Sequence, residues 1–175
     1  MAASRNRRPD LLARVGGFIA DRLTTAGRIC VGLSGGCDSV VLLHLLRQQP
    51  DWAGRLSAIH IDHGLSPNAH VWADFCADYC RQLGVPLRIH RVTVARSSGS
   101  GLEAAARAAR YTAFAEVDAD CLALAQHRGD QAETVLLNLL RGAGVNGAAA
   151  MPGERRHGHL RLWRPLLDET RADIE

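Results

Sequence analysis

Short apolar segments alternate along the chain with longer segments whose apolar residues recur at helical spacing. The short apolar segments, which should form strands, span residues 29–33, 56–61, 87–94, 121–125 and 160–167. The segments with helical spacing span residues 38–48, 68–83, 102–117 and 130–141, and a further helix begins within 168–175. This alternation predicts an α/β fold with a mainly parallel five-stranded sheet and helices on both of its faces.

Two of the expected helices carry apolar stripes, which we expect to be buried. In residues 68–83 the stripe consists of Cys76 and Cys80 with Trp72, Phe75, Tyr79 and Leu83. In residues 130–141 it consists of Ala132, Val135, Leu136, Leu139 and Leu140. A free cysteine behaves as a small apolar residue. The five cysteines include no Cys-x-x-Cys pair, so they favour core positions over a metal site.

Polar residues cluster where three of the expected strands end. Ligands of open parallel sheets bind beyond the carboxyl ends of the strands. The loops at 34–39, 62–66 and 126–133 are rich in polar side chains. Because the carboxyl ends of parallel strands share one edge, these loops should form a single site. Residues 96–101 predict a Ser/Gly-rich loop, and residues 153–159 are basic and polar.

The composition is that of one globular domain: 175 residues, 47% hydrophobic and 22% charged. We expect a helix within residues 1–27 to pack on a domain formed by residues 28–175, which is expected to be truncated at its C-terminal end. No apolar run approaches the roughly 20 residues of a membrane-spanning helix, and Arg14 interrupts any secretory signal, so we expect a cytoplasmic protein without a membrane partner.

The charge pattern gives little support for a nucleic-acid partner by itself. The formal net charge is only +3. All 21 basic residues are arginine, which suits bidentate phosphate contacts. A biased codon usage explains this arginine content better than selection for phosphate binding.

The segment SGGCDS, residues 34–39, joins the first strand to its helix. Glycines let backbone N–H groups approach a ligand closely, and a helix begins with unpaired N–H groups and a positive dipole end. These features make an anion site suited to phosphates. The segment is not a Walker motif, because no Gly-Lys-Ser/Thr follows. If fewer residues of this segment had matched, an ordinary turn with Ser or Asp as the helix N-cap would explain them instead.

This segment resembles the loop of the ATP pyrophosphatases, the PP-loop superfamily, and four further segments narrow the resemblance. These are HIDHGLS at 60–66, EAAARAARY at 103–111, AQHRGDQAET at 125–134, and the pair RGAG at 141–144 with RPLL at 164–167. In this order they resemble the N-terminal catalytic domain of the tRNA(Ile)-lysidine synthetases, over residues 29–171. The resemblance implies a Rossmann-like fold of the adenine nucleotide alpha hydrolase type.

The resemblance also implies a reaction and its participants. ATP would activate the wobble cytidine of an isoleucine tRNA as an adenylate, and free lysine would displace AMP to form lysidine. The implied cofactors are ATP and Mg²⁺, with Asp38 as the magnesium ligand, and a homodimer is possible. The implied ATP-binding residues are Ser34, Gly35, Gly36, Cys37, Asp38, Ser39, His60 and Asp62.

Several charged residues complete the candidate site, each with an alternative reading. Asp130 and Glu133 are candidate catalytic residues with Asp38, although a charged helix face is usually only solvated. We expect them to position and deprotonate the attacking lysine, whereas Asp130 could merely cap its helix. Arg107, Arg110 and Arg141 are candidates for phosphate or tRNA contacts. Arg107 could equally form a helix-stabilising pair with Glu103.

Two residues depart from the family pattern His-His-x-Asp-Asp-Gln. Gln126 replaces the first histidine and Gly129 the first aspartate. Glutamine can donate and accept hydrogen bonds but cannot transfer a proton. Two other functions stay open. One is another PP-loop tRNA-modifying enzyme such as a thiolase, which usually carries paired cysteines. The other is a fragment that binds ATP without turnover.

Overall fold

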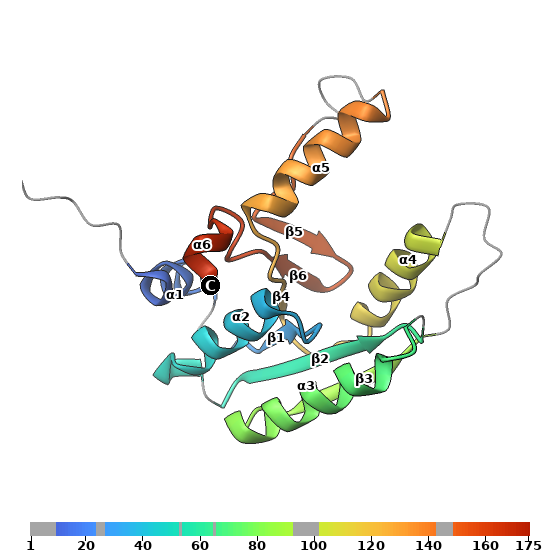
Figure 1. The fold of residues 1–175 in the computed structure, drawn as a ribbon. Helices are drawn as coiled ribbons and strands as arrows, with labels where there is room; N and C mark the ends of the chain where they lie inside the picture. Colours follow the sequence, from blue (N-terminus) through green and yellow to red (C-terminus); the bar gives the residue numbers. More distant parts are fainter. Residues whose placement is uncertain (1–9, 24–26, 53, 65, 93–101, 143–148) are drawn as a thin grey trace, which may run out of the picture.

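The computed structural model describes residues 10–23, 27–52, 54–64, 66–92, 102–142 and 149–175 (Figure 1). Its centre is a six-stranded sheet in the order β3-β2-β1-β4-β6-β5. Neighbouring strands are parallel except β5 and β6, which form an antiparallel pair. The strands are β1 (Ile29–Gly32), β2 (Leu56–Asp62), β3 (Leu87–Arg91), β4 (Cys121–Ala123), β5 (Glu154–His157) and β6 (Leu160–Trp163). This architecture confirms the predicted α/β class.

The sheet has one strand more than the five that the pattern predicted. The additional strand is β5, which lies within the basic segment 153–159. It pairs on one side only, at the edge of the sheet, and its side chains are mostly exposed. An edge strand of this kind needs no alternation of apolar residues, so its sequence gives no strand signal. The predicted strand at 160–167 ends early, at Trp163.

Helices are found where helical spacing predicted them, with ends that differ by up to three residues. Their bounds are α1 (Leu11–Ala20), α2 (Cys37–Arg47), α3 (Ala69–Leu83), α4 (Leu102–Phe114), α5 (Arg128–Leu140) and α6 (Arg171–Ile174), with a 3₁₀ turn η1 (Pro50–Trp52). No helix among the described residues is long and apolar enough to cross a membrane. The predicted loop at 96–101 lies outside the described residues.

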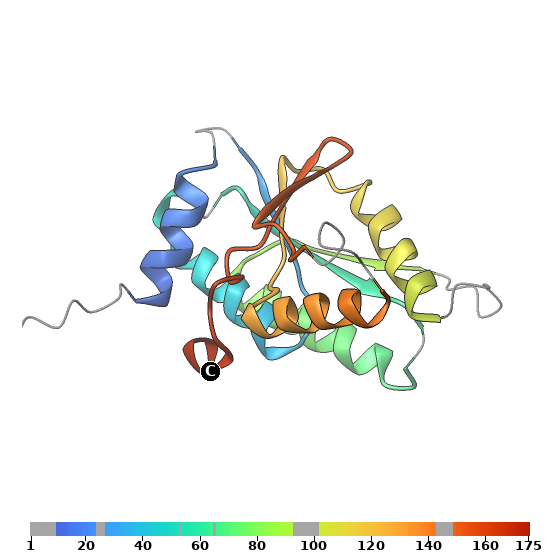
Figure 2. The same cartoon turned by 90° about the horizontal axis from the view of Figure 1, so that it is seen from above.

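Both faces of the sheet are covered, and the apolar residues divide accordingly. Side chains of α1, α2 and α3 pack with Ile29 and Val31 of β1 on one face. On the other face Phe114 of α4 packs with Cys30 of β1 and with residues of β4 and β6. Figure 2 shows α4 on the opposite side of the sheet from α2 and α3. Successive residues of a strand point to opposite faces, which is why β1 is apolar throughout.

The predicted stripe of α3 is buried only in part. Cys76 and Cys80 are almost completely buried against the sheet, as expected. Trp72 and Phe75 are 48% and 44% exposed, so the prediction for these two residues is wrong. They lie at the margin of the helix, beside the loop that follows β1.

The predicted burial of α5 is wrong. None of its residues is buried, and Leu136, Leu139 and Leu140 are each more than half exposed. Figure 1 shows α5 extending away from the sheet. Periodicity identifies the apolar side of a helix, but it does not show whether another element covers that side.

A buried ion pair fastens the N-terminal helix to the end of the chain. Arg14 of α1 donates to both carboxylate oxygens of Glu169, at 2.9 Å from Nε and 2.7 Å from Nη2. Glu169 is only 3% exposed, and its carbonyl accepts a hydrogen bond from the N–H of Arg128, where α5 begins. The pair therefore connects α1, the C-terminal segment and the start of α5.

We expect Arg14→Ala to destabilise the protein by about 3 kcal/mol, because it leaves the buried Glu169 carboxylate without its main counter-charge. Arg81→Ala is the matched control. Arg81 pairs with Asp78 at 2.7 Å, but both side chains are more than half exposed, and such pairs contribute about 1 kcal/mol or less. Urea denaturation measures both values. If both variants lost the same free energy of unfolding, the buried Arg14–Glu169 pair would stabilise the protein no more than an exposed pair does.

Candidate functional site

The main cavity opens at the carboxyl edge of the sheet, where β1 lies beside β4. From β1 the chain proceeds outward through β2 and β3, whereas β4 and β6 lie on the other side of β1. The point where the strand order reverses is the usual ligand site of such sheets. A cavity of about 540 Å³ is found here, lined by residues that follow β1, β2 and β4. The predicted convergence of the three polar loops is confirmed.

Two serines hold the loop of residues 34–39 in a closed shape. The N–H of Ser34 donates to Ser39 Oγ at 3.1 Å, and Ser39 Oγ donates to the carbonyl of Gly36 at 2.9 Å. Ser34 Oγ accepts from the N–H of Gly36 at 3.2 Å and lies 3.0 Å from Ser39 Oγ. The hydroxyls therefore order the backbone, in addition to being potential ligand donors.

The same loop presents unpaired backbone donors. α2 has Gly36 as its N-cap and no side-chain cap. The N–H groups of Cys37, Asp38 and Ser39 find no acceptor among the described residues. An uncapped helix start of this kind favours an anion. The expected anion site is therefore available in the structure.

Gly35 explains why the loop needs glycine. Its φ of +88° is in the region that residues with a side chain rarely adopt. A Cβ at this position would also lie 3.1 Å from Trp72 Cε3 and 3.4 Å from Cys76 Sγ. The aromatic margin of α3 thus supports the back of the loop.

Across the cavity, His127 stands between two carboxylates. Its Nε2 lies 3.7 Å from Asp38 Oδ2 and 3.7 Å from Asp130 Oδ2. Its Nδ1 accepts a hydrogen bond from the N–H of Gly129 at 2.9 Å, which assigns the proton of the neutral ring to Nε2. Asp130 in turn accepts from the N–H of His127 at 2.8 Å and so caps α5. Histidine and aspartate together hold the start of α5 opposite Asp38.

The structure gives a local reason for glycine at position 129, where the family pattern has aspartate. A Cβ at this position would lie 2.6 Å from Cε1 and 3.0 Å from Nδ1 of His127. An aspartate here, the residue common in the family pattern, would force the imidazole away from its cap position. Glycine therefore fits the ring orientation that points Nε2 at Asp38 and Asp130. Gln126 lines the cavity, and its Oε1 is buried without a donor among the described residues.

The end of β2 contributes His60 and Asp62 to the cavity wall, and the loop after it contributes His63. His60 Nδ1 lies 2.8 Å from the carbonyl of Leu33, and Asp62 Oδ1 accepts from the N–H of Gly64 at 2.9 Å. Both predicted ATP-binding residues thus also shape the backbone. Burial lowers the pKa of His63, and the neighbouring Arg110 lowers it further. Arg110, at 3.4 Å from His63, supplies the positive charge on this side.

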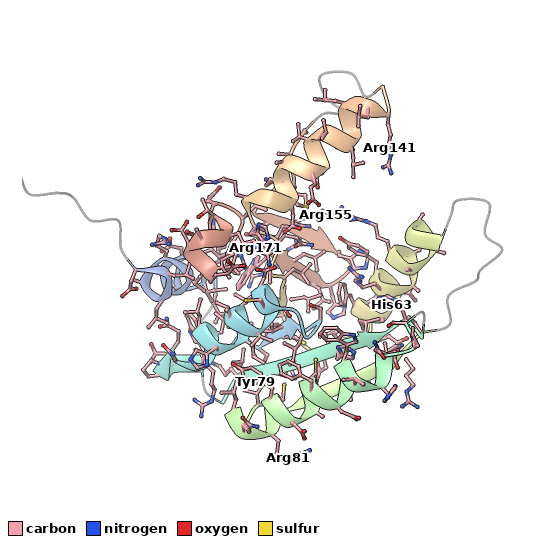
Figure 3. The ribbon with its side chains drawn as sticks, in the orientation of Figure 1. His63, Tyr79, Arg81, Arg141, Arg155 and Arg171 are labelled. Carbon is pink, nitrogen blue, oxygen red and sulfur yellow. The ribbon has the colours of Figure 1, made fainter. Side chains whose placement is uncertain are left out.

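Not every predicted residue lines the cavity. Arg110 and Asp130 do, whereas Glu133 is exposed one turn further along α5. α5 begins at Arg128, so Asp130 is in its first turn but Glu133 is not. Arg141 caps the far end of α5, away from the sheet (Figure 3). Arg107 contacts Tyr111 on α4, also outside the cavity lining.

Two residues near the loop were not among the predicted site residues. One is His127, although its motif was recognised. The other is Arg171 of α6, whose pKa is raised by its bond to Glu175 and, more weakly, by Asp38. Arg171, which pairs with Glu175 at 2.7 Å, therefore lies near enough to Asp38 for the two charges to interact. Arg171 is distant from Asp38 in sequence, so only the folded structure could reveal that the two are close.

A family model described as a PP-loop domain matches residues 9–175. The chain belongs to the PP-loop family. Among curated relatives, the chain is 53% identical to a tRNA(Ile)-lysidine synthase of Neisseria meningitidis serogroup B, over 84% of this chain and 35% of the relative. It is 51% identical to that of Pseudomonas aeruginosa, over 86% and 34%. The chain thus spans about a third of the length of these relatives.

Solved structures of PP-loop and related enzymes share the fold. The U34-tRNA thiolase NcsA from Methanococcus maripaludis, solved with a [4Fe-4S] cluster, superposes with a TM-score of 0.73 at 21% identity. The match covers 94% of this chain and 60% of the thiolase. A glutamine-dependent NAD+ synthetase from Acinetobacter baumannii gives 0.58 at 14% identity, over 94% and 30%. At these identities the likeness concerns the fold alone.

Residues 34–39, which we call the PP-loop, include a carboxylate beside the unpaired N–H groups of α2. Asp38 Oδ1 is buried and has no donor among the described residues. Mg²⁺ in nucleotide sites is usually held by one or two carboxylates together with phosphate oxygens. The described residues contain no cluster of three metal-binding side chains. Asp38 beside the anion site therefore fits a magnesium ion that arrives with a nucleotide, and does not resemble an all-protein metal cage.

We expect Cys37 to be the one cysteine that iodoacetamide modifies in the folded protein at about pH 8. Cys37 is exposed, while the other four cysteines are buried. Burial raises the pKa of Cys30 and Cys121 to about 12 and that of Cys76 and Cys80 to about 11. These four stay protonated, and the thiolate is the reactive form. Mass spectrometry should find one label, absent from Cys37→Ser. Labelling of the four at a similar rate would contradict the packing described.

Proposed function

We propose that this chain carries the ATP-dependent step of lysidine formation at the wobble cytidine of isoleucine tRNA. The observation that carries the proposal is the convergence at the β1–β4 crevice. The PP-loop with its unpaired N–H groups lies on one side, and the His127–Asp130 pair at the start of α5 lies on the other. The relatives named tRNA(Ile)-lysidine synthase support the choice of substrate. Their greater length makes the activity of the whole protein part of the proposal.

The PP-loop would hold the phosphates that leave as pyrophosphate. The N–H groups of Cys37, Asp38 and Ser39 would donate to phosphate oxygens, and Asp38 would hold the magnesium ion. Magnesium, when bound, neutralises the charge that develops on the phosphates. The end of β2, with His60 and Asp62, would contact the nucleoside. The cytidine carbonyl oxygen would then attack the α-phosphate from the open side of the cavity.

The start of α5 would receive the lysine. The ε-amine arrives as an ammonium and must lose a proton before it attacks the adenylated ring carbon and displaces AMP. Asp130 lines the cavity, and Glu133 lies three residues later on the same helix. Two carboxylates would attract the ammonium, and one of them could accept its proton directly or through water. His127 would keep Asp130 in place by the hydrogen bonds that cap the helix.

A sulfur-transfer function is less well supported, although a thiolase shares the fold. Thiolases of this type usually carry paired cysteines, whereas four of the five cysteines here are buried in the core. We place the proposed activity in the cytoplasm, where tRNA, lysine and ATP meet. A homodimer, and a division into residues 1–27 and a catalytic domain at 28–175, stay predictions.

We expect Asp130→Asn and Glu133→Gln to abolish lysine incorporation while leaving the affinity for ATP–Mg²⁺ within about twofold. Removing a proton acceptor typically costs 10²–10⁴-fold in rate. The amide that Asp130→Asn introduces keeps an oxygen that can cap α5, so stability should be preserved. Radiolabelled lysine, an isoleucine tRNA transcript and ATP–Mg²⁺ measure incorporation, and calorimetry measures ATP binding.

Asp78→Asn, an exposed carboxylate of α3, is the matched control and should change neither quantity. Loss of ATP binding together with incorporation would make these carboxylates nucleotide or magnesium ligands. If lysine incorporation were unchanged, the carboxylates of α5 would have no role in the reaction and would only be solvated. An unmodified chain that binds ATP and never incorporates lysine would leave only the ATP-binding function.

A further inference from the structure

Three arginines gather around Tyr111 at the edge of the cavity wall, on α4, β5 and the segment after β6. The guanidinium carbon of Arg107 lies 5.4 Å from the centre of the Tyr111 ring, and that of Arg155 lies 5.7 Å from it. Arg164 is close enough for the charges of both to act on it. We call Arg107, Arg155 and Arg164 the arginine cluster. Figure 3 shows Arg155 reaching from β5 toward α4.

The arginine cluster has no carboxylate counter-charges of the kind that seven other arginines of the described residues possess. No carboxylate among the described residues pairs with any of its three members. Elsewhere in the described parts of the chain, arginines commonly pair with carboxylates within 4 Å, as do Arg14, Arg22, Arg28, Arg81, Arg88, Arg91 and Arg171. Three neighbouring positive charges without a carboxylate partner among the described residues favour the binding of an external anion.

Arg164 is the most informative member, because it is only 3% exposed. Its Nη1 donates to the carbonyl of Pro152 at 2.8 Å, but its Nε is buried and has no acceptor among the described residues. Burial lowers the pKa of Arg164 and the neighbouring Tyr111 hydroxyl raises it, while the charges of Arg155 and Arg107 lower it. Arginine nevertheless stays charged in proteins. A buried, incompletely bonded guanidinium is costly unless a ligand completes its surroundings.

The arginine cluster is continuous with the proposed active site. Phe114 lines the cavity and packs edge-to-face against Tyr111, with ring centres 5.8 Å apart. Arg110, at the cavity wall, lies on the same helix as Arg107 and one turn away. Positive charge therefore extends from the cavity to the arginine cluster over the outer side of α4 and β5.

We propose that the arginine cluster binds phosphodiester groups of the RNA whose reacting base enters the cavity. Arginine is suited to this ligand because its planar fork contacts two phosphate oxygens at once. A mononucleotide held by the PP-loop would end within the cavity. A polynucleotide must leave it, and its flanking phosphates would then lie along Arg110, Arg107 and Arg155. The inference rests on the proposed function for its choice of RNA.

The test is the salt dependence of binding of a fluorescent anticodon stem–loop of isoleucine tRNA to this chain. Binding should be weak and salt-sensitive, between about 50 and 200 mM salt. Arg155→Gln and Arg107→Gln should each weaken it about fivefold and reduce the slope of log K against log salt by about 0.7–0.9. Arg81→Gln changes the net charge equally at a distant surface (Figure 3). It should leave the affinity and the salt slope unchanged within error.

ATP–Mg²⁺ calorimetry on the same variants separates the sources of phosphate. Unchanged ATP affinity is expected. Weaker ATP binding with unchanged RNA binding would assign the arginine cluster to the nucleotide and overturn the proposal. Equal effects of Arg155→Gln and Arg81→Gln on RNA would also overturn it, because only net charge would then matter.

The proposal and the proposed function can fail separately. A chain that never forms lysidine, but whose salt slope falls in the arginine cluster variants, would leave the RNA site standing without the activity. A chain that forms lysidine, but binds RNA with the same slope in all variants, would remove the RNA site and leave the activity.

Discussion

The parallel pairing of β1 with β4 is the constraint on which the rest of the site depends. β1 and β4 are distant in sequence, yet Ile29, Cys30 and Val31 pair directly with Cys121, Leu122 and Ala123. Both strands are buried on both faces, so their register is fixed by packing as well as by hydrogen bonds. This pairing sets the PP-loop beside the loop that begins α5. Without it, Asp38 and Asp130 would have no common cavity.

The two sides of the crevice are stabilised by different means. On the PP-loop side, Ser34 and Ser39 close the loop and Gly35 fits against Trp72, which leaves the helix N–H groups free for an anion. On the α5 side, the polar groups bond to one another: His127 to Gly129, and Asp130 to His127. Unpaired N–H groups thus face a hydrogen-bonded pair, to which the proposed function assigns the second substrate. This division agrees with a reaction that has two successive steps.

The sequence predicted the α/β class, most element positions and the meeting of three loops, because buried strands and turn residues carry strong local signals. It did not predict β5, whose exposed edge position requires no apolar pattern. It wrongly predicted that Leu136, Leu139 and Leu140 would be buried, since periodicity shows which side of a helix is apolar but not what covers it. His127 and the unpaired charge of Arg164 depend on distances between separate elements, which no local pattern encodes.

The proposed function requires the PP-loop to bind ATP with magnesium through Asp38, whose buried Oδ1 has no donor among the described residues. Isothermal titration of ATP in the presence and absence of Mg²⁺ tests it most directly, on the unmodified chain, on Asp38→Ala and on the exposed control Asp78→Ala. We expect magnesium-dependent binding that Asp38→Ala weakens at least tenfold, or about 1.4 kcal/mol, while Asp78→Ala leaves it unchanged. Equal affinities for Asp38→Ala and the unmodified chain would contradict this expectation.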